Sequence, residues 1–218
     1  ILYWLASAEN FPTITIRQIV ILVLVVIWGG RLTFNWIRSW KGLNHEDWRY
    51  TKFREEKPSL FWFINFTGLQ MMPTLIVFLG CVPIYYSIIS TSTSFSVYDV
   101  IGIIIVLGAI IIETVADEQL RNFLKTMQKG ELMTKGIWSV TRHPNYFGEV
   151  SFWWGMFFFT IANGISNLWV VVGPIGITIL FLIVSIPLME KRLMKKYPGY
   201  NEYKSSVSVF IPWFRRRN

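Results

Sequence analysis

The stretch DVIGIIIVLGAIIIETVA, residues 99–116, is almost entirely apolar and long enough to cross a bilayer. About 20 predominantly apolar residues in a helix span the ~30 Å hydrocarbon core of a membrane. The helical pattern continues past the apolar part as far as Gln128. We therefore expect one long helix, Val97–Gln128, that begins as a membrane span and ends outside the hydrocarbon.

Other stretches of the chain have the same apolar character. We expect spans at Ile16–Trp40, Thr67–Ile89, Tyr146–Ala162 and Leu168–Met189, with an interfacial approach at Leu60–Phe66 before the second of them. Pro73 and Pro83 are expected to kink that second span. Ile1–Ser7 resembles the tail of a further helix, and the chain begins at Ile1 without a methionine, so we expect a preceding transmembrane segment to be missing.

These spans predict an all-α, multi-span transmembrane helix bundle with about six spans, forming a single integral membrane domain over residues 1–218. Composition agrees, because 53% of the residues are hydrophobic and only 16% are charged, whereas a soluble domain has about a quarter charged residues. The single cysteine, Cys81, excludes an intrachain disulfide. The two histidines, His45 and His143, belong to no cluster with metal-ligand spacing, so we expect no metal site.

The net charge of +8 would suggest a nucleic-acid partner in a soluble protein. Here the basic residues are concentrated in segments 41–57 and 118–145 and in the tail from 190, whereas segments 8–17, 90–97 and 163–167 are short and almost uncharged. Basic loops mark the cytoplasmic side. We therefore expect a multi-pass protein of a bacterial inner membrane or endoplasmic reticulum, with its polar chemistry on the cytoplasmic side and no nucleic-acid partner.

The segment WSVTRHPNYFGEVSFWW, residues 138–154, contains the densest polar chemistry. A cation, an imidazole, an amide, a phenol and a carboxylate fall within eight positions: Arg142, His143, Asn145, Tyr146 and Glu149. Such a group at a membrane boundary indicates that something polar binds there. Histidine titrates near working pH, and His143 and Tyr146 can both donate protons. Asn145 can bind a ribose or carboxamide, and Trp153 can stack on an aromatic ring.

Basic side chains elsewhere can neutralise phosphate groups, for which the planar fork of arginine is well suited. The candidates are Arg121, Lys125, Arg142, Lys191 and Arg192. A nucleotide-bearing cofactor fits this inventory, and so does an anionic lipid headgroup. No GxGxxG segment after a strand, Walker A sequence or HExxH is present.

Two ionisable residues fall inside apolar stretches, where charge is a functional hypothesis by default. Arg31 lies about half-way along its span, with snorkelling to the interface as the alternative. Glu113 lies near the hydrocarbon edge and begins a series spaced four residues apart, with Asp117, Arg121 and Lys125, so these four side chains share one helix face. An ion-pair stripe along that helix is the alternative.

Several segments together resemble the DUF1295 family of the steroid 5α-reductase C-terminal domain superfamily: WGGRLTFNWIRSWKGLNHEDWRY (28–50), VADEQLRNF (115–123), TRHPNYFGEVSFWWG (141–155), IPLMEKRL (186–193) and KKYPGYNEYKSSVSVFIPWF (195–214). The resemblance implies a seven-helix membrane enzyme that binds NADPH from the cytoplasmic side and reduces a carbon–carbon double bond of a lipid. It implies cofactor contacts by Asp117, Asn145 and Trp153. Arg142, His143, Tyr146 and Glu149 lie in the same matching segment, and Glu190 and Arg192 match the tail motif. Residues 110–218 would form the cofactor-binding half.

We therefore expect NADPH-dependent reduction of an enone-type double bond in a steroid-like or other lipid. Tyr50, Tyr146 and Glu149 are the candidates for polarising the carbonyl or delivering the proton. The steroid 5α-reductases proper use a glutamine–glutamate pair on an early helix and a tyrosine near the position of Trp28.

Two alternatives remain. S-adenosylmethionine-dependent methyltransferases of lipids or isoprenylcysteine carry a similar RHPxYxG segment, although they usually have two adjacent glutamates before the tail, where this chain has Glu190 and Lys191. A non-enzymatic membrane protein that docks lipids or a partner on its basic face is the third reading.

Overall fold

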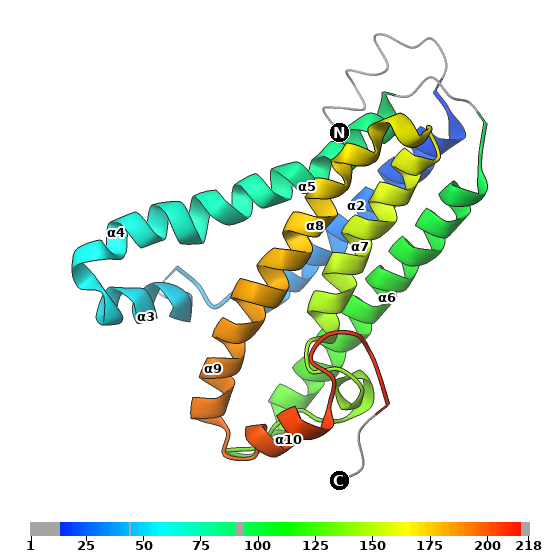
Figure 1. Ribbon diagram of the computed structural model, residues 1–218. Coiled ribbons are helices and arrows are strands. Elements are labelled where there is room, and N and C mark those ends of the chain that lie inside the picture. Colours follow the sequence, from blue (N-terminus) through cyan, green and yellow to red (C-terminus); the bar gives the residue numbers. More distant parts are fainter. Residues whose placement is uncertain (1–13, 44, 90–93, 215–218) are drawn as a thin grey trace.

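The structure, a computed structural model, describes residues 14–43, 45–89 and 94–214. Long helices lie side by side in a bundle, and two short helices lie at one end (Figure 1). The uninterrupted long helices are α2 (Ile16–Ser39), α6 (Val97–Thr126) and α7 (Pro144–Ile161). The described residues contain no strand, only an isolated parallel bridge between Thr141 and Ser208. The predicted all-α class is confirmed.

Two further long helices are composite. The first runs over Pro58–Ile88 and joins a 3₁₀ turn (Pro58–Leu60), α4 (Phe61–Ile64), a π-helical segment (Asn65–Met71) and α5 (Met72–Ile88). The second joins a 3₁₀ turn (Ile165–Val171), α8 (Val172–Ile179), a π-helical segment (Leu180–Ser185) and α9 (Ile186–Lys196). The short elements are α3 (Trp48–Glu56), a 3₁₀ turn (Gly136–Ser139) and α10 (Tyr200–Ser206).

Four described helices are long and apolar enough to cross a membrane: Ile16–Ser39, Pro58–Ile88, Val97–Thr126 and Asn167–Lys196. About six spans were expected. α7 has 18 residues, or ~27 Å at 1.5 Å per residue, but its first turns, PNYFGE, make it less apolar than these four. The expected remnant at Ile1–Ser7 lies outside the described residues.

Three predicted boundaries differ from those of the structure. The interfacial segment 60–66 and the span 67–89 form one continuous helix, and a π-helical segment (Asn65–Met71) lies where they join. The last span does not end at Met189 but continues to Lys196. The α6 helix ends at Thr126, two residues before the predicted Gln128.

The starts of α2 and α6 are fixed by capping boxes. Thr15 accepts from the backbone of Gln18, whose side chain accepts from the Thr15 backbone, and Ser96 and Asp99 form the same reciprocal pair at α6. Each box satisfies two backbone donors that a helix start otherwise leaves without a partner. The side chains that begin these helices therefore also set where the spans start.

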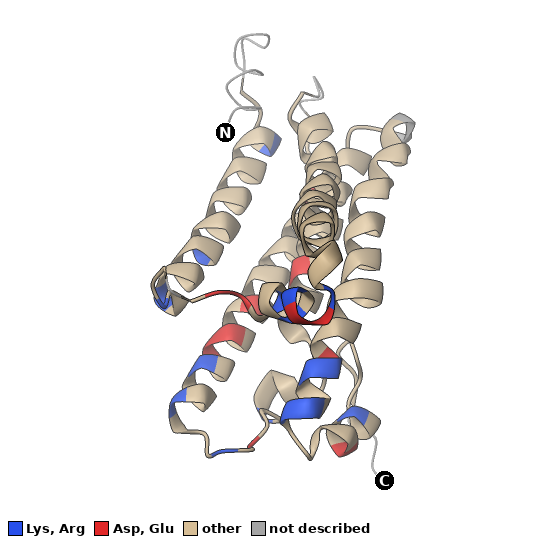
Figure 2. Ribbon diagram, turned by 90° about the vertical axis from the view of Figure 1, so that its left-hand side faces the viewer, with Lys and Arg blue, Asp and Glu red and all other residues tan. Residues whose placement is uncertain are grey.

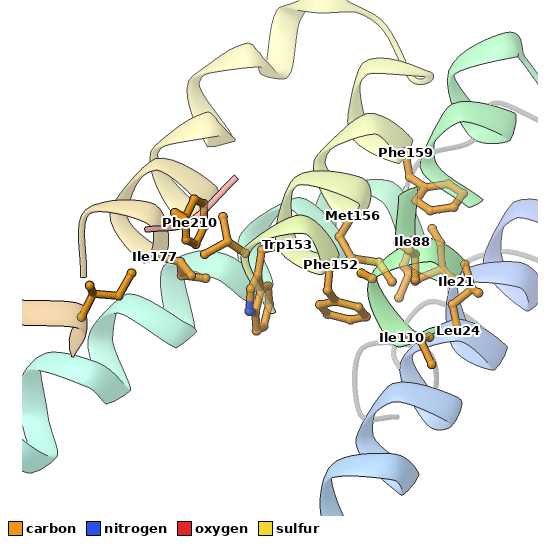
Figure 3. Packing of buried hydrophobic residues seen from close by; sticks show 14 residues of the cluster. Ile21, Leu24, Ile88, Ile110, Phe152, Trp153, Met156, Phe159, Ile177 and Phe210 are labelled. Atoms are coloured by element: carbon orange, nitrogen blue, oxygen red, sulfur yellow. The ribbon is translucent and has the colours of Figure 1, made fainter. Parts of the chain in front are cut away.

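Glycines bring α6 and α7 into close contact. A Cβ atom built on Gly148 would lie 2.4 Å from Cγ of Glu113, and one on Gly155 would lie 2.5 Å from Cγ2 of Val106. Small residues allow helix backbones in membranes to approach closely. The core beside this contact includes Phe152, Trp153 and Met156 of α7 (Figure 3). The packing thus places Glu113 directly against the first turns of α7.

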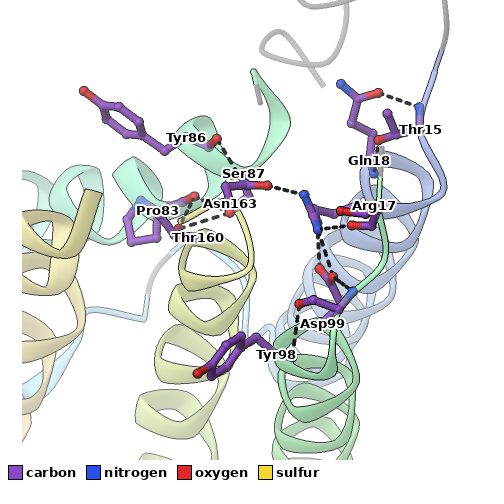
Figure 4. A network of polar contacts seen from close by, with 12 residues as sticks. Thr15, Arg17, Gln18, Pro83, Tyr86, Ser87, Tyr98, Asp99, Thr160 and Asn163 are labelled. Atoms are coloured by element: carbon purple, nitrogen blue, oxygen red, sulfur yellow. Dashed lines mark hydrogen bonds and ion pairs between the residues drawn. The ribbon is translucent and has the colours of Figure 1, made fainter. Parts of the chain in front are cut away.

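The two ends of the bundle differ in their polar chemistry. Charged residues gather around α3, α9, α10 and the last turns of α6 (Figure 2). At the other end, Arg17 forms a buried ion pair with Asp99 at 2.7 Å and donates to the Ser94 carbonyl and to Asn163 (Figure 4). Gln18 donates to the Ile88 carbonyl at 2.6 Å. We call this second group the Arg17 cluster. It ties α2, α6 and the ends of α5 and α7 together.

Candidate functional site

A cavity of about 500 Å³ lies between α5, α7 and the α8–α9 helix, next to the start of α3. Most of its wall is apolar. Its polar groups include Tyr146 and Glu149 of α7, with Trp153 beside them, Asp47 and Arg49 at the α3 end, and Ser185. We call it the main cavity.

The start of α3 is held by its own ion pair. Asp47 caps the helix by accepting from the Arg49 backbone, and its carboxylate also binds the Arg49 guanidinium at 2.9 Å. Partial burial by itself would raise the pKa of Asp47, but the bonds to Arg49 outweigh it and hold that pKa below its usual value. The same contact raises the pKa of Arg49. Both groups therefore stay charged at the mouth of the cavity at neutral pH.

Aromatic rings form the inner wall. Trp153 donates its indole N–H to Glu149 Oε1 at 3.0 Å, which orients that carboxylate. Trp28 of α2 stacks on Phe152 with ring centroids 4.1 Å apart and meets Trp153 edge-on at 5.5 Å. Trp153 therefore contacts both the main cavity and the interface between α2 and α7.

A charged network joins α2 to α6 beside these rings. Arg31 Nη1 binds Asp117 Oδ2 at 2.9 Å, and its Nη2 binds Glu113. The Arg31 side chain is only 12% exposed and points toward the carboxylates of α6. The charges also do not form a stripe along α6, because Glu113 and Asp117 pair across to α2.

Asn35 extends this network along α2. It donates to Asp117 Oδ2 at 2.8 Å and accepts from Arg121. An open groove of about 360 Å³ runs beside it between α2 and α6, lined by Asn35, Asp117, Arg121 and Lys125 among others. The predicted shared face of α6 therefore exists, and it faces α2.

Four buried polar atoms in this region make no hydrogen bond of standard geometry within the described part of the chain: Trp28 Nε1, Arg31 Nε, Glu113 Oε1 and Arg121 Nε. Arg121 Nε has the Glu118 carboxylate 3.6 Å away, and the Trp28 indole lies within reach of the Glu149 carboxylate. Leaving a buried polar group without a partner costs about 1–3 kcal/mol. We call Trp28 Nε1, Arg31 Nε and Glu113 Oε1, two donors and one acceptor from α2 and α6, the unpaired trio.

Arg142, His143 and Glu190 form a separate buried cluster at the start of α7. Arg142 binds Glu190 at 2.8 Å and donates to the carbonyls of Lys204 and Val207 at 2.7 and 2.6 Å. His143 Nε2 lies 3.4 Å from the same Glu190 oxygen. These contacts tie the start of α7 to α9, to α10 and to the residue that follows α10.

A smaller cavity of about 170 Å³ lies beside that cluster. Its polar lining residues include His143, Asn145, Tyr146 and Tyr200. Tyr146 lines both cavities, and its ring stacks on His143 at 5.4 Å. Asn145 accepts from the Tyr146 backbone at 3.1 Å, so its side chain also helps to begin α7.

The remaining predicted residues are spread over the charged end. Tyr50 lies on α3 and lines neither cavity. Arg192 packs its guanidinium over the Trp48 ring at 4.5 Å and so joins α9 to α3. Lys125 lies in the groove between α2 and α6. The structure thus brings Arg31, Glu113, Asp117 and Arg121 together and leaves Tyr50 and Arg192 apart from them.

Trp28, Asn35 and the Asp47–Arg49 pair were not predicted as site residues. Trp28 and Asn35 lie three residues before and four residues after Arg31, which places all three on one face of α2. Their shared face with Arg31 could therefore have identified Trp28 and Asn35 as site residues from the sequence. The position of Asp47 and Arg49 against α7 depends on the path of the chain after α2, which no local pattern predicts.

The fold and this site define an all-helical protein whose long apolar helices enclose mainly apolar cavities with a few polar groups, near the charged end of the bundle. The chain belongs to the family described as a protein of unknown function, DUF1295, which matches residues 2–207. It is similar to Uncharacterized protein C594.04c of Schizosaccharomyces pombe, with 23% identity over 235 residues that cover 97% of this chain and 68% of that protein. No solved structure matches it. The predicted family is therefore confirmed.

Proposed function

We propose that the protein is a multi-pass membrane oxidoreductase that uses NADPH to reduce an enone-type carbon–carbon double bond of a steroid-like or other lipid. The resemblance to the steroid 5α-reductase superfamily supports this proposal. So does the arrangement of an apolar cavity next to a buried polar network. In this proposal α7 is a fifth described span, and the charged end of the bundle faces the cytoplasm of a bacterium or of an endoplasmic reticulum-bearing cell.

The unpaired trio carries the proposal. A primary carboxamide has a carbonyl oxygen that accepts hydrogen bonds and an amino group that donates them. Trp28 Nε1 and Arg31 Nε would serve the carbonyl, and Glu113 Oε1 would accept from the amino group. The nicotinamide of NADPH bears such a group. The donors and acceptor of the trio therefore match the carboxamide of this cofactor in type, and Arg121 and Lys125 in the adjoining groove suit its phosphates.

When bound, NADPH supplies the hydride that would reach the β-carbon of the substrate. The protein must then polarise the carbonyl and provide a proton for the α-carbon, so that the double bond becomes a single bond. We assign the proton to Tyr146, because this residue lines the main cavity and a phenol can donate a proton. Glu149 is held by Trp153 on the same wall and can orient the polar end of the substrate. Tyr50 is the weaker choice, since it lines neither cavity.

Methyl transfer from S-adenosylmethionine is the second candidate, and the same trio favours it. The carboxylate of an amino acid would accept from Trp28 and Arg31, and its ammonium would donate to Glu113. The two cofactors are therefore to be titrated separately into the purified full-length protein, with the thermal unfolding midpoint in detergent as the measurement. Saturable stabilisation by NADPH alone is the expected result. Stabilisation by the methyl donor alone would refute the reductase proposal, and stabilisation by neither would favour the docking alternative.

One variant tests the trio itself. Trp28→Phe removes an indole N–H but retains an aromatic ring against Phe152, so NADPH affinity should fall about tenfold, the value of one hydrogen bond. Trp154→Phe is the matched control, because the Trp154 indole binds Thr178 at 3.1 Å away from the trio. Equal affinities for Trp28→Phe and wild type would remove Trp28 from the cofactor site.

A further inference from the structure

The main cavity lies between the two π-helical segments of the described chain. Asn65–Met71 contributes Gly68 and Leu69 to its wall, and Leu180–Ser185 contributes Leu180, Phe181, Val184 and Ser185. π-Helical turns are rare and are often found at functional sites. Two such segments, more than a hundred positions apart in sequence, meet at one cavity. Their meeting at one cavity indicates that this cavity is a functional site.

The helices that carry these segments touch at one end and separate toward the other. A Cβ atom on Gly173 of α8 would lie 2.3 Å from the Leu79 carbonyl oxygen of α5, so the two backbones are in direct contact there. Gly80 packs equally closely against Ile177 and Trp153. From this crossing the two helices diverge toward α3 (Figure 1). The cavity occupies the space between the diverging halves, below a closed apex.

Apolar and polar residues lie on different parts of the cavity wall. The residues contributed by the two diverging helices are mainly apolar, among them Leu69, Met72, Val77, Phe181 and Val184. Apart from Ser185, the polar groups are on α7 and at the start of α3. Both diverging helices are candidate membrane spans, so the side between them faces hydrocarbon when the bundle lies in a bilayer. An amphiphile fits this wall, with its polar group at Tyr146 and Glu149.

We propose that the main cavity binds a lipid with a polar end and an extended apolar body, which enters sideways from the bilayer between the two π-helical segments. Gly68 sets the room available for the apolar body. Around an ideal Cβ on Gly68 the nearest atom is Ile64 Cγ2 of its own helix, 4.0 Å away, so a side chain there has space to fill the cavity. The lipid's conversion rests on the proposed reductase function, whereas its binding does not.

Photolabelling tests this route in the full chain. The protein is reconstituted into phosphatidylcholine vesicles that contain a fatty acid with a diazirine on its chain, illuminated, digested and mapped by mass spectrometry. Labels should concentrate in the peptides that carry 65–72 and 180–189. Gly68→Trp should abolish these labels. Gly108→Trp is the matched control, because nothing lies within 4 Å of a Cβ on that α6 glycine, and it should keep them.

Val184→Trp fills the opposite wall and serves as a second test, with the thermal unfolding midpoint as the check on folding of each variant. The lateral route would be overturned by labels that spread evenly over all exposed faces of the spans. It would also be overturned if Gly68→Trp and Val184→Trp both fold and both keep the wild-type labels. NADPH titration separates the two proposals. Cavity labelling in a protein that does not bind NADPH would leave lipid binding in place and remove the reductase function.

Discussion

Two arginines on α2 show how burial decides what an ion pair contributes. Arg31 and Arg38 both pair with carboxylates of α6, but the Arg31 side chain is 12% exposed and that of Arg38 is 35% exposed. A buried pair that loses one partner leaves an uncompensated charge, which costs about 3–5 kcal/mol. A solvent-exposed pair contributes only about 0–1 kcal/mol.

Arg31→Ala should therefore lower the free energy of unfolding by about 3–5 kcal/mol, because Glu113 and Asp117 both lose their cation. Arg38→Ala removes the same side chain from the same helix and a 3.0 Å pair with Glu118, and should cost less than about 1 kcal/mol. Denaturant unfolding of both variants in detergent is the measurement. Equal losses would mean that the Arg31 network is as hydrated as the surface.

The buried hydroxyl of Tyr200 makes no hydrogen bond of standard geometry with a described residue, and the Glu190 carboxylate is the acceptor within its reach. Burial, and then the nearby negative charge of Glu190, raise the pKa of Tyr200 above its ordinary value of about 10. The folded state therefore holds the phenol proton more tightly than the unfolded state. Its contribution to stability is complete below about pH 10 and declines as the pH rises toward the folded pKa.

Tyr200→Phe should be at least as stable as wild type at pH 8, because it removes a buried polar group that makes no hydrogen bond of standard geometry. It should also lose less stability than wild type between about pH 10 and 11. Tyr203→Phe is the control, since Tyr203 donates its hydroxyl to the Trp138 carbonyl and its loss should cost about 0.5–1.5 kcal/mol. Thermal unfolding across this pH range measures both, and a wild-type alkaline profile for Tyr200→Phe would contradict the assignment.

At the scale of the elements, the long apolar helices followed from composition and their internal irregularities did not. The predicted span 16–40 corresponds to the helix Ile16–Ser39, which is long and apolar enough to cross a membrane. The predicted span 146–162 corresponds to the helix Pro144–Ile161, which is not among the four described helices of that length and apolarity. The π-helical segments had no such signal. They depend on how neighbouring helices pack, which a single segment does not encode.

Contacts between elements show the same limit in the candidate site. Arg31, Glu113 and Asp117 were identified singly because charge inside an apolar run is conspicuous. Their mutual pairing was not predicted, since it depends on α2 packing against α6. Likewise, Arg142 was expected to bind phosphate, whereas its nearest partners are Glu190 and two tail carbonyls. Residue type indicated chemistry, and only the packing indicated the partner.

Close packing of α6 and α7 leads to a prediction about Gly148. Gly148→Ala would place a methyl group 2.4 Å from Cγ of Glu113 and 3.0 Å from the Ala109 carbonyl oxygen, and such overpacking costs about 1–3 kcal/mol. Gly108→Ala on α6 meets nothing within 4 Å and should be neutral or stabilising by up to about 1 kcal/mol. Denaturant unfolding compares the two, and a neutral Gly148→Ala would show that the helices can separate without loss.

At the scale of the whole molecule, a buried charge cluster lies at each end of the bundle. The Arg17 cluster satisfies its groups with the protein itself, through Asp99, Asn163 and the Ser94 carbonyl. The Arg31 network instead leaves the unpaired trio. Arg17 was part of a segment treated as an almost uncharged turn, because an arginine at a helix start gives no local sign of a buried partner 82 positions away. The contrast suggests that one end fastens the helices and the other binds a ligand.

Removing one carboxylate from each end tests this division. Asp99→Ala deprives Arg17 of its buried partner and should lower the free energy of unfolding by about 3–5 kcal/mol, while NADPH affinity, measured by titration on the folded protein, stays at the wild-type value. Asp117→Ala should instead lose NADPH binding and lose less stability than Asp99→Ala. Arg31 keeps Glu113, so the loss of stability is smaller, but Asn35 and Arg31 lose the acceptor that positions them, and NADPH binding should be abolished.

Asp99→Asn, which keeps an acceptor for Arg17, replaces Asp99→Ala if the latter does not fold. Loss of NADPH binding in a folded Asp99 variant would show that the two ends are coupled through α6, and wild-type binding in Asp117→Ala would exclude this network from the cofactor site.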